Sequence, residues 1–155
     1  MARFVHIADA RDAARIRRSG LRSTRDLFCV PMTADPLSAF QWARELRARG
    51  YRTSIAIIFV VPDERLVSVG RFGQPGTEMT AAQAVDFFRR QDDSRGLEVR
   101  ISGSVGAGDV KSIRRVPRNA GWRFYPEAKG KRPFWPFRGS INARRLRHTI
   151  ETGNR

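Results

Sequence analysis

Glu98 is the residue of this chain whose type and position most strongly suggest chemistry. It lies in residues 97–101, where apolar side chains alternate with Glu98 and Arg100 in the period-two pattern of a strand with one buried face. A carboxylate near the start of such a strand, facing away from the core, is placed to meet a ligand in a cleft. The alternative is an exposed carboxylate that pairs with Arg100 or another arginine.

Other kinds of reactive site find little support in the sequence. The histidines are His6 and His148, which are far apart, and no carboxylate cluster stands at ligand spacing, so we expect no metal site. The single cysteine, Cys29, allows no disulfide within the chain and is typical of a small buried residue. The sequence also lacks the nucleophile elbow of serine hydrolases and a phosphate-binding glycine loop before a helix.

The composition indicates one folded, strongly basic domain. The chain has 155 residues, 41% of them hydrophobic, with a net charge of +15. Residues 1–110 carry 17 Lys and Arg against 13 Asp and Glu, whereas residues 111–155 carry 13 against 2. A polyanion such as nucleic acid is therefore the first partner to consider. The alternative is a solvated surface in which a GC-biased genome has favoured arginine over lysine.

No segment has the length of a membrane span. The apolar run at residues 53–61 is nine residues long, too short to cross a bilayer, and no signal peptide is evident. We therefore expect a cytoplasmic protein that does not bind membranes.

The first third of the chain predicts two strands and two helices. Residues 3–8 are typical of a strand, and Asp9 is a good N-cap for a helix over 10–19 that Gly20 would end. Residues 27–32 predict a second strand. Asp35 and Pro36 start a helix that would continue to Gly50.

The remainder predicts mainly strands. Residues 53–61 read as a strand buried on both faces, followed by a turn at 62–63 and a returning strand over 66–72, which together form a hairpin. A loop at 73–79 precedes a helix over 81–91 with a capping box formed by Thr80 and Gln83. Further strands are expected at 97–101, 112–117 and 122–125, and a basic helix at 142–151. The fold class is α+β.

Three blocks, in order, give the chain a resemblance to a known family. They are the strand and helix from Phe4 to Leu21, the strand, helix and long strand over 27–61, and the strand with Glu98 and its trailing apolar pattern to Ile113. Together they resemble ADP-ribosyltransferase-fold proteins, nearest the branch of RNA 2′-phosphotransferases and the DNA-modifying DarT toxins. The resemblance covers residues 3–117 and implies a split β-sheet core with flanking helices.

The resemblance implies a site for NAD⁺, which would be a substrate. Glu98 would be the catalytic carboxylate, which stabilises the positive charge that develops on the ribose when nicotinamide leaves, and His6 would bind a ribose hydroxyl. Arg3 would pair with the pyrophosphate. An aromatic ring would stack on nicotinamide, and the candidates are Phe28, Phe40, Trp42 and Phe72.

The C-terminal tail lies outside this resemblance. It interleaves cations with aromatic rings, which suits contact with phosphates and stacking on bases. The residues we expect to bind nucleic acid are Lys129, Lys131, Arg132, Trp135, Arg138, Arg144 and Arg145. The alternative is that the aromatic side chains at 134–137 hold the tail against the core.

These features lead to one functional expectation and two alternatives. We expect an ADP-ribosyltransferase-like domain over residues 1–127 with a basic extension over 128–155, which transfers ADP-ribose to nucleic acid or removes a 2′-phosphate from it. The first alternative is a non-catalytic module that binds nucleic acid. The second is an enzyme that hydrolyses NAD⁺ or modifies protein. The sequence leaves the acceptor and the oligomeric state open.

Overall fold

A computed structural model describes residues 1–32, 42–43, 46, 50 and 53–116. Its strands are β1 (Ala2–Asp9), β2 (Asp26–Pro31), β3 (Ser54–Val61), β4 (Leu66–Arg71), β5 (Thr77–Thr80), β6 (Leu97–Ser102) and β7 (Val110–Arg115). The helices are α1 (Ala13–Ser19) and α3 (Ala81–Arg89), with short 3-10 turns η1 (Ala10–Asp12) and η2 (Ala107–Asp109). Trp42, Ala43 and Leu46 are also helical. The architecture is a small α+β domain, as predicted.

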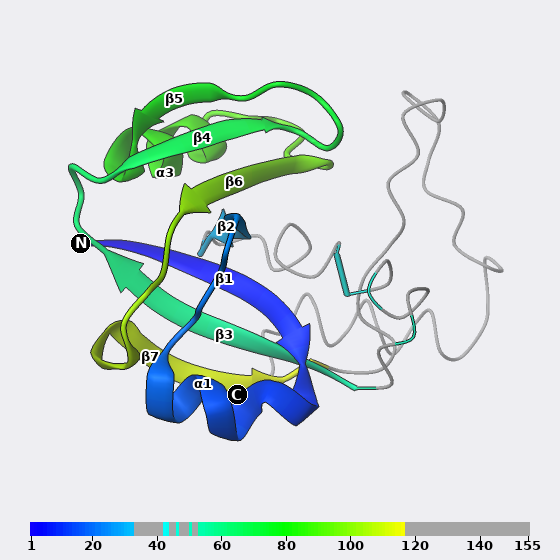
Figure 1. Cartoon of the computed structure of the whole chain (residues 1–155). Coiled ribbons are helices and arrows are strands. Elements are labelled where there is room, and N and C mark those ends of the chain that lie inside the picture. Colours follow the sequence, from blue (N-terminus) through cyan, green and yellow to red (C-terminus); the bar gives the residue numbers. More distant parts are fainter. Residues whose placement is uncertain (33–41, 44–45, 47–49, 51–52, 117–155) are drawn as a thin grey trace, which may run out of the picture.

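The seven strands form an antiparallel sheet in the order β5-β4-β6-β2-β1-β3-β7. In Figure 1 the sheet divides into an upper half (β4, β5 and β6) and a lower half (β1, β3 and β7), with β2 between them. The pairing of β1 with β2 is limited to two positions, Phe4 with Pro31 and Val5 with Val30. By contrast, β1 and β3 pair along their whole length. The joint between the two halves is therefore the least paired part of the sheet.

The predicted hairpin between residues 53–61 and 66–72 is wrong. Both strands exist, but β3 pairs with β1 and β7, whereas β4 pairs with β5 and β6. A turn follows β3, in which the Arg65 N–H donates to the Pro62 carbonyl at 3.2 Å. This turn carries the chain from the lower half to the upper half. Both edges of β3 are occupied by strands from elsewhere in the sequence, so β4 has no free edge to pair with.

The hairpin that does form here joins β4 to β5. Residues 77–79, which we expected to be loop, and the N-cap Thr80 form β5, which pairs with β4 from Leu66 opposite Thr80 to Val69 opposite Thr77. Residues 97–101 form β6 as predicted, and residues 110–115 form β7, slightly earlier than expected. The strand expected at 122–125, the helix expected at 142–151 and most of the helix expected at 36–50 lie outside the described residues.

Signals read from the sequence mark the start of α3 and the end of α1, whereas α1 begins three residues later and α3 ends two residues earlier than expected. The Thr80 hydroxyl accepts from the Gln83 N–H while the Gln83 side chain accepts from the Thr80 N–H, which completes the capping box of α3. The Asp9 carboxylate accepts from the Arg11 N–H and caps η1, so the first turn is 3-10 and α1 begins at Ala13. Gly20 ends α1 with a φ of 73°.

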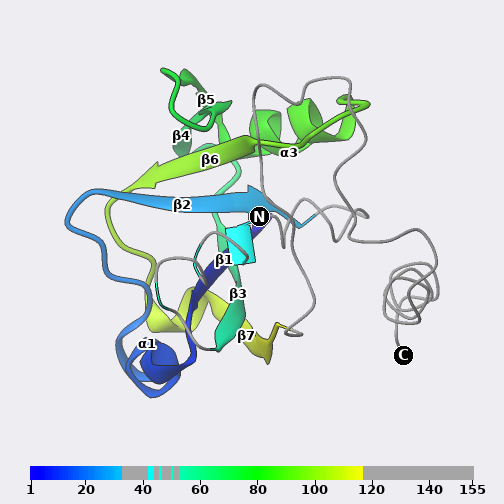
Figure 2. The ribbon, with the colours of Figure 1, turned by 90° about the vertical axis from the view of Figure 1, so that its right-hand side faces the viewer.

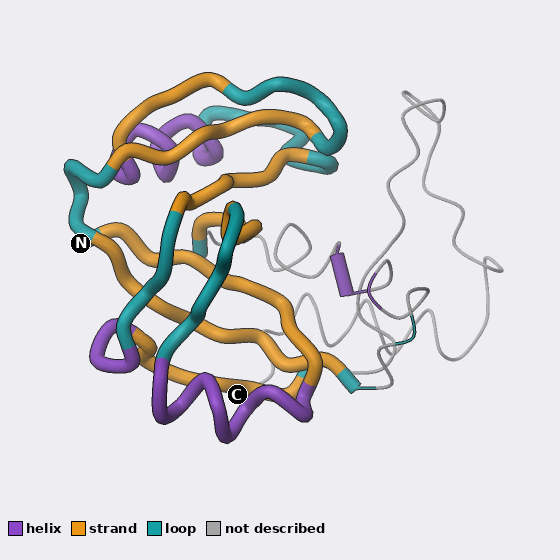
Figure 3. Tube along the Cα trace, viewed as in Figure 1, coloured by secondary structure: helices purple, strands orange, loops and turns teal. Residues whose placement is uncertain are grey.

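The helices cover the sheet, and the core lies between. Helix α1 lies at the lower half and α3 lies against β4 and β5 (Figure 3). Ile16 of α1 and Ala81, Ala84 and Phe88 of α3 are buried. Strand β3 is buried at every position except Ile58, as expected for a strand covered on both faces. Phe4 and Phe59, which stack with ring centroids 6.0 Å apart, are both fully buried.

Candidate active site

Strand β6 holds Glu98 inside the molecule, between two other strands. Glu98 lies opposite Gly70 of β4, and Arg100 lies opposite both Phe28 of β2 and Ser68 of β4. Residues two apart on a strand, and residues directly opposite across an antiparallel pair, share a face of the sheet. Glu98, Arg100 and Phe28 therefore face the same way. Only 3% of the Glu98 surface is exposed, which is less than the one-sided strand predicted from the sequence would leave.

Arg100 forms an ion pair with the Glu98 carboxylate. Its Nε and Nη2 atoms both lie 2.8 Å from Oε1 of Glu98. Burial raises the pKa of the Glu98 carboxyl, and the hydrogen bond and charge of Arg100 oppose this shift without cancelling it. Among the described residues, none donates a hydrogen bond to Oε2 of Glu98.

The same guanidinium also binds the loop that joins β4 to β5. Arg100 Nη2 donates to the Gln74 carbonyl at 2.8 Å and lies 3.4 Å from the Arg71 carbonyl. Gly76 in this loop comes so close to β4 that a Cβ on Gly70 would meet its Cα at 3.0 Å. One arginine side chain therefore fixes the position of the carboxylate and of the loop beside it.

His6 reaches the same group of strands from β1. Its Nδ1 atom lies 2.7 Å from the Phe28 carbonyl, an oxygen that no main-chain group of β1 pairs with. Because a carbonyl can only accept, Nδ1 carries the proton and the neutral ring leaves Nε2 as an acceptor. Burial lowers the pKa of the His6 imidazole, against the smaller opposing effects of the Phe28 bond and the charge of Asp12. The neutral form is thus favoured.

Aromatic rings lie next to this polar group. The Phe28 ring lies 6.0 Å from the Arg100 guanidinium and is 51% exposed. Phe72, which follows β4 directly, is 47% exposed and packs against Trp42 with ring centroids 5.3 Å apart. Among the described aromatic candidates for stacking, Phe28 is the one whose ring lies beside the Arg100 guanidinium.

The structure thus brings Phe28 and Glu98 together on one face of the sheet. His6 contacts the main chain of Phe28, but the pairing of Val5 with Val30 puts the His6 side chain on the opposite face. Phe28 links His6, through its carbonyl, to Arg100 and Glu98, through its ring. Arg3 lies three residues before His6 on β1, so the two side chains point to opposite faces of that strand. Arg3 is exposed, and its carbonyl accepts from the Met32 N–H at 2.9 Å.

Several predicted residues lie outside the described part of the chain. These are Phe40 and the expected nucleic-acid contacts Lys129, Lys131, Arg132, Trp135, Arg138, Arg144 and Arg145. In the part that is described, no group of three or more His, Cys, Asp or Glu side chains is placed to hold a metal ion. None of the described helices has the length and apolar character needed to cross a membrane.

The wider role of Arg100 was not evident from the sequence, in which it was expected only as a possible ion-pair partner of Glu98. The spacing of an acid and an arginine two residues apart on a strand predicts that they share a face, and the structure confirms this pairing. The hydrogen bonds from Arg100 to the carbonyls of Arg71 and Gln74 join β6 to a distant loop, and no local pattern indicates them.

Comparisons of the chain with protein-family models, curated proteins and solved structures found no significant match. The function is therefore inferred from the arrangement of these side chains.

Proposed function

We propose that this protein cleaves NAD⁺ between nicotinamide and ribose, and transfers the ADP-ribose to nucleic acid or uses it to remove a 2′-phosphate. The observation that carries the proposal is the Glu98 carboxylate, which is buried in β6 and held by Arg100 at 2.8 Å through one oxygen, while no described residue donates a hydrogen bond to the other oxygen. The divided sheet also supports the proposal, because the family that the sequence resembles has a split sheet. Here Glu98 and His6 come from β6 and β1, the strands on the two sides of β2.

The chemistry requires stabilisation of positive charge on a sugar. When the C–N bond to nicotinamide breaks, its electron pair leaves with the nicotinamide and the ribose becomes oxocarbenium-like. Oε2 of Glu98 would accept a hydrogen bond from the adjacent 2′-hydroxyl and lower the energy of that cation. A nucleophile on the acceptor then bonds to C1 of the ribose, and its proton passes to the carboxylate or to water.

Burial suits Glu98 both to stabilising the positive charge on the ribose and to accepting a proton. A carboxylate shielded from water interacts more strongly with developing charge than an exposed one. Its raised pKa also makes it a better proton acceptor than an ordinary glutamate. The hydrogen bond and charge of Arg100 limit this rise in the pKa.

Phe28 would hold the rest of the ligand, together with His6 if the ligand enters the joint where the pairing of β1 with β2 ends. The bare Nε2 of neutral His6 is an acceptor for a ribose hydroxyl. Phe28, exposed and beside Arg100, offers a flat apolar surface on which nicotinamide could stack. Release of nicotinamide would then leave the ring face free for the next ligand.

The charge of the chain favours nucleic acid as the acceptor. Residues 117–155 carry ten Lys and Arg and two Asp and Glu. Such a segment attracts phosphates over a distance set by the ionic strength. A protein acceptor would not require such an excess of positive charge.

The test compares Glu98→Gln with Glu78→Gln, an exposed glutamate on β5, in the full chain. Each protein is incubated with NAD⁺ and single- or double-stranded DNA or RNA, one of them bearing a 2′-phosphate. Nicotinamide release is followed by chromatography and acceptor mass by mass spectrometry. Glutamine keeps the size of the side chain and can still accept from Arg100. We expect Glu98→Gln to lower turnover by about 10²–10³-fold and Glu78→Gln to leave it within about twofold.

The outcomes separate the alternatives. Nicotinamide release without a modified acceptor would show an NAD⁺ hydrolase, or an enzyme that acts on protein. Tight, salt-sensitive nucleic-acid binding with no loss of NAD⁺ would refute the enzyme and leave a binding module. Equal turnover in the two glutamine variants would remove Glu98 from the mechanism.

A further inference from the structure

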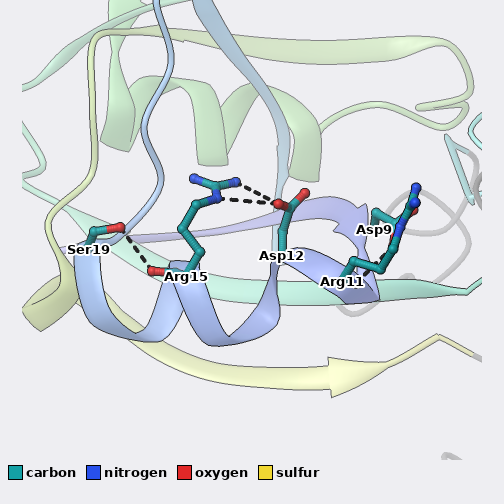
Figure 4. A network of polar contacts seen from close by, with 5 residues as sticks. All are labelled: Asp9, Arg11, Asp12, Arg15 and Ser19. Carbon is teal, nitrogen blue, oxygen red and sulfur yellow. Dashed lines mark hydrogen bonds and ion pairs between the residues drawn. The ribbon is translucent and has the colours of Figure 1, made fainter.

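The α1 end of the molecule carries many arginines, two of which are neutralised locally. Figure 4 shows these two pairs at the start of the helix. Arg11 contacts the buried Asp9 carboxylate at 2.9 Å, and Arg15 contacts Asp12 at 3.1 Å. Neither of these arginines adds much net positive charge to the surface.

The other five cations of α1 and β7 have no acidic partner among the described residues. They are Arg17 and Arg18 in the last turn of α1 and Lys111, Arg114 and Arg115 on β7. All five are exposed, and none forms an ion pair with a residue in the described part of the chain. The acidic residue nearest in sequence to the three cations of β7 is Asp109 in η2. Arg114 and Arg115 are neighbours on β7, so their side chains lie on the two sides of this strand. We call the five residues together the α1–β7 cationic surface.

Strand register and packing place the two elements together. Arg115 pairs with Ile55, and Ile55 pairs with Ala8, just before the turn that begins α1. At its other end, α1 stops at Gly20, which packs against residues 105–107, directly before β7. Helix α1 therefore runs along the lower half from one end of β7 to the other, and both lie far from α3 (Figure 2).

We infer that the α1–β7 cationic surface binds the phosphate backbone of the nucleic-acid acceptor, an inference that rests on the proposed function. Four of the five side chains are arginines, whose forked donors match phosphate oxygens. Strand β7 leads directly into the basic segment 117–155, so the cationic sequence begins within the folded domain.

The apolar surface argues against a lipid membrane as the partner. The large apolar side chains that the structure exposes are Met1, Phe28, Met32, Leu66 and Phe72. None of them belongs to α1 or β7, whereas peripheral membrane elements insert apolar groups beside their cations. The surface offers charge and hydrogen-bond donors alone, which suits a phosphodiester chain.

The test uses two separate charge reversals in the full chain, Arg17→Glu with Arg18→Glu, and Arg114→Glu with Arg115→Glu. The matched control, Arg89→Glu with Arg90→Glu, makes the same change of net charge at the C-terminal end of α3. Binding of a fluorescein-labelled 20-nucleotide DNA, single-stranded and duplex, is followed by anisotropy between 50 and 300 mM NaCl. Each variant is first shown to melt cooperatively, and Gln versions replace any that does not.

We expect each reversal on the surface to weaken binding about tenfold or more at 100 mM NaCl. The slope of log affinity against log salt should fall by about 0.7–0.9 for each phosphate that the variant no longer neutralises. The control should change the affinity less than threefold. Equal weakening by all three variants would overturn the inference, because net charge alone would then explain binding. Unchanged affinity, or binding to anionic phosphatidylserine vesicles in preference to DNA, would also overturn it.

This test is independent of the test of catalysis. If the unaltered protein binds DNA through these residues but releases no nicotinamide from NAD⁺, the proposed function fails and the surface assignment stands. If the protein releases nicotinamide and the reversals leave DNA binding unchanged, only the surface assignment fails.

Discussion

At Glu98, burial and ion pairing act on the carboxyl group in opposite directions. Removal from water favours the neutral acid, whereas Arg100 favours the carboxylate, and the net result is a raised pKa. A group with a raised pKa in the folded state costs stability once the pH is high enough to ionise it. Retaining an acid at this position is therefore unfavourable for the fold itself, a pattern common at functional sites.

This balance predicts how Glu98→Gln changes stability with pH. The folded pKa lies above the unfolded value of about 4.5. The contribution of Glu98 to stability is thus greatest below pH 4.5 and declines as the pH rises through the folded pKa. The difference in unfolding free energy, glutamine variant minus wild type, should grow from pH 4.5 upward and then level off. Urea unfolding from pH 4 to 8 measures it, with Glu78→Gln as the control. A difference that shrinks with rising pH would contradict the assignment.

Among the connections between elements, the end of α1 places the strictest demand on residue type. Gly20 has a φ of 73° and a ψ of −166°, a conformation that essentially only glycine adopts. A Cβ there would meet the Val105 carbonyl oxygen at 2.1 Å. This close approach lets Leu21 and Val105 exchange two main-chain hydrogen bonds of 2.9 Å. The contact joins the start of the chain to the segment before β7.

We therefore expect Gly20→Ala to lower the free energy of unfolding by about 2–3 kcal/mol. Gly108→Ala is the matched control, because Gly108 has no atom within 4 Å of an added Cβ. Its effect should stay within about 0.5 kcal/mol. Thermal and urea unfolding measure both variants. Equal stability of the two would show that α1 does not need this close contact.

The elements also show which structural features the sequence could predict. Caps and stops depend on residues a few positions apart, so Thr80 with Gln83, and Gly20, were identified correctly. Strand partners depend on distant segments. The turn after Val61 indicates that the chain reverses, but it does not reveal that β1 and β7 already occupy both edges of β3. Strand β5 was missed because Thr77–Thr80 is short and largely polar.

In the candidate site, too, the sequence predicts what depends on nearby residues and not what depends on distant strands. The sequence indicated Glu98 and His6 through their strand patterns and a family resemblance. It could not choose among the aromatic rings, because the contact of Phe28 with Arg100 depends on the register between β2 and β6. The hydrogen bond from His6 to the Phe28 carbonyl forms where β1 and β2 no longer pair, because their pairing is limited to Phe4–Pro31 and Val5–Val30.

At the scale of the whole molecule, the net charge of +15 is the dominant feature. Like charges repel over the Debye length, which is about 30 Å at 0.01 M salt and about 8 Å at 0.15 M. Uncompensated charge of this size weakens the compact state when salt is low. A polyanion that binds the folded protein would offset the same repulsion.

We expect the melting temperature to rise by several degrees as NaCl increases from about 0.01 to about 0.15 M. At 0.01 M, addition of DNA should raise it further, and this increment should vanish as salt approaches 0.5 M. Scanning fluorimetry measures both effects, with a neutral polymer of similar length as the control. A melting temperature that falls with added salt would show that local ion pairs outweigh the general repulsion.

The position of β7 at the outer edge of the sheet also bears on solubility. Strand β3, with the sequence Ser-Ile-Ala-Ile-Ile-Phe-Val-Val, combines apolar and β-branched residues with no charge, which is the composition of segments that aggregate through their edges. Strand β7 covers that edge and replaces it with one that bears Lys111, Arg114 and Arg115. Charged side chains on an outer strand discourage pairing with another molecule. The cations at this edge thus keep neighbouring copies of the protein apart in a crowded solution, whatever else they bind.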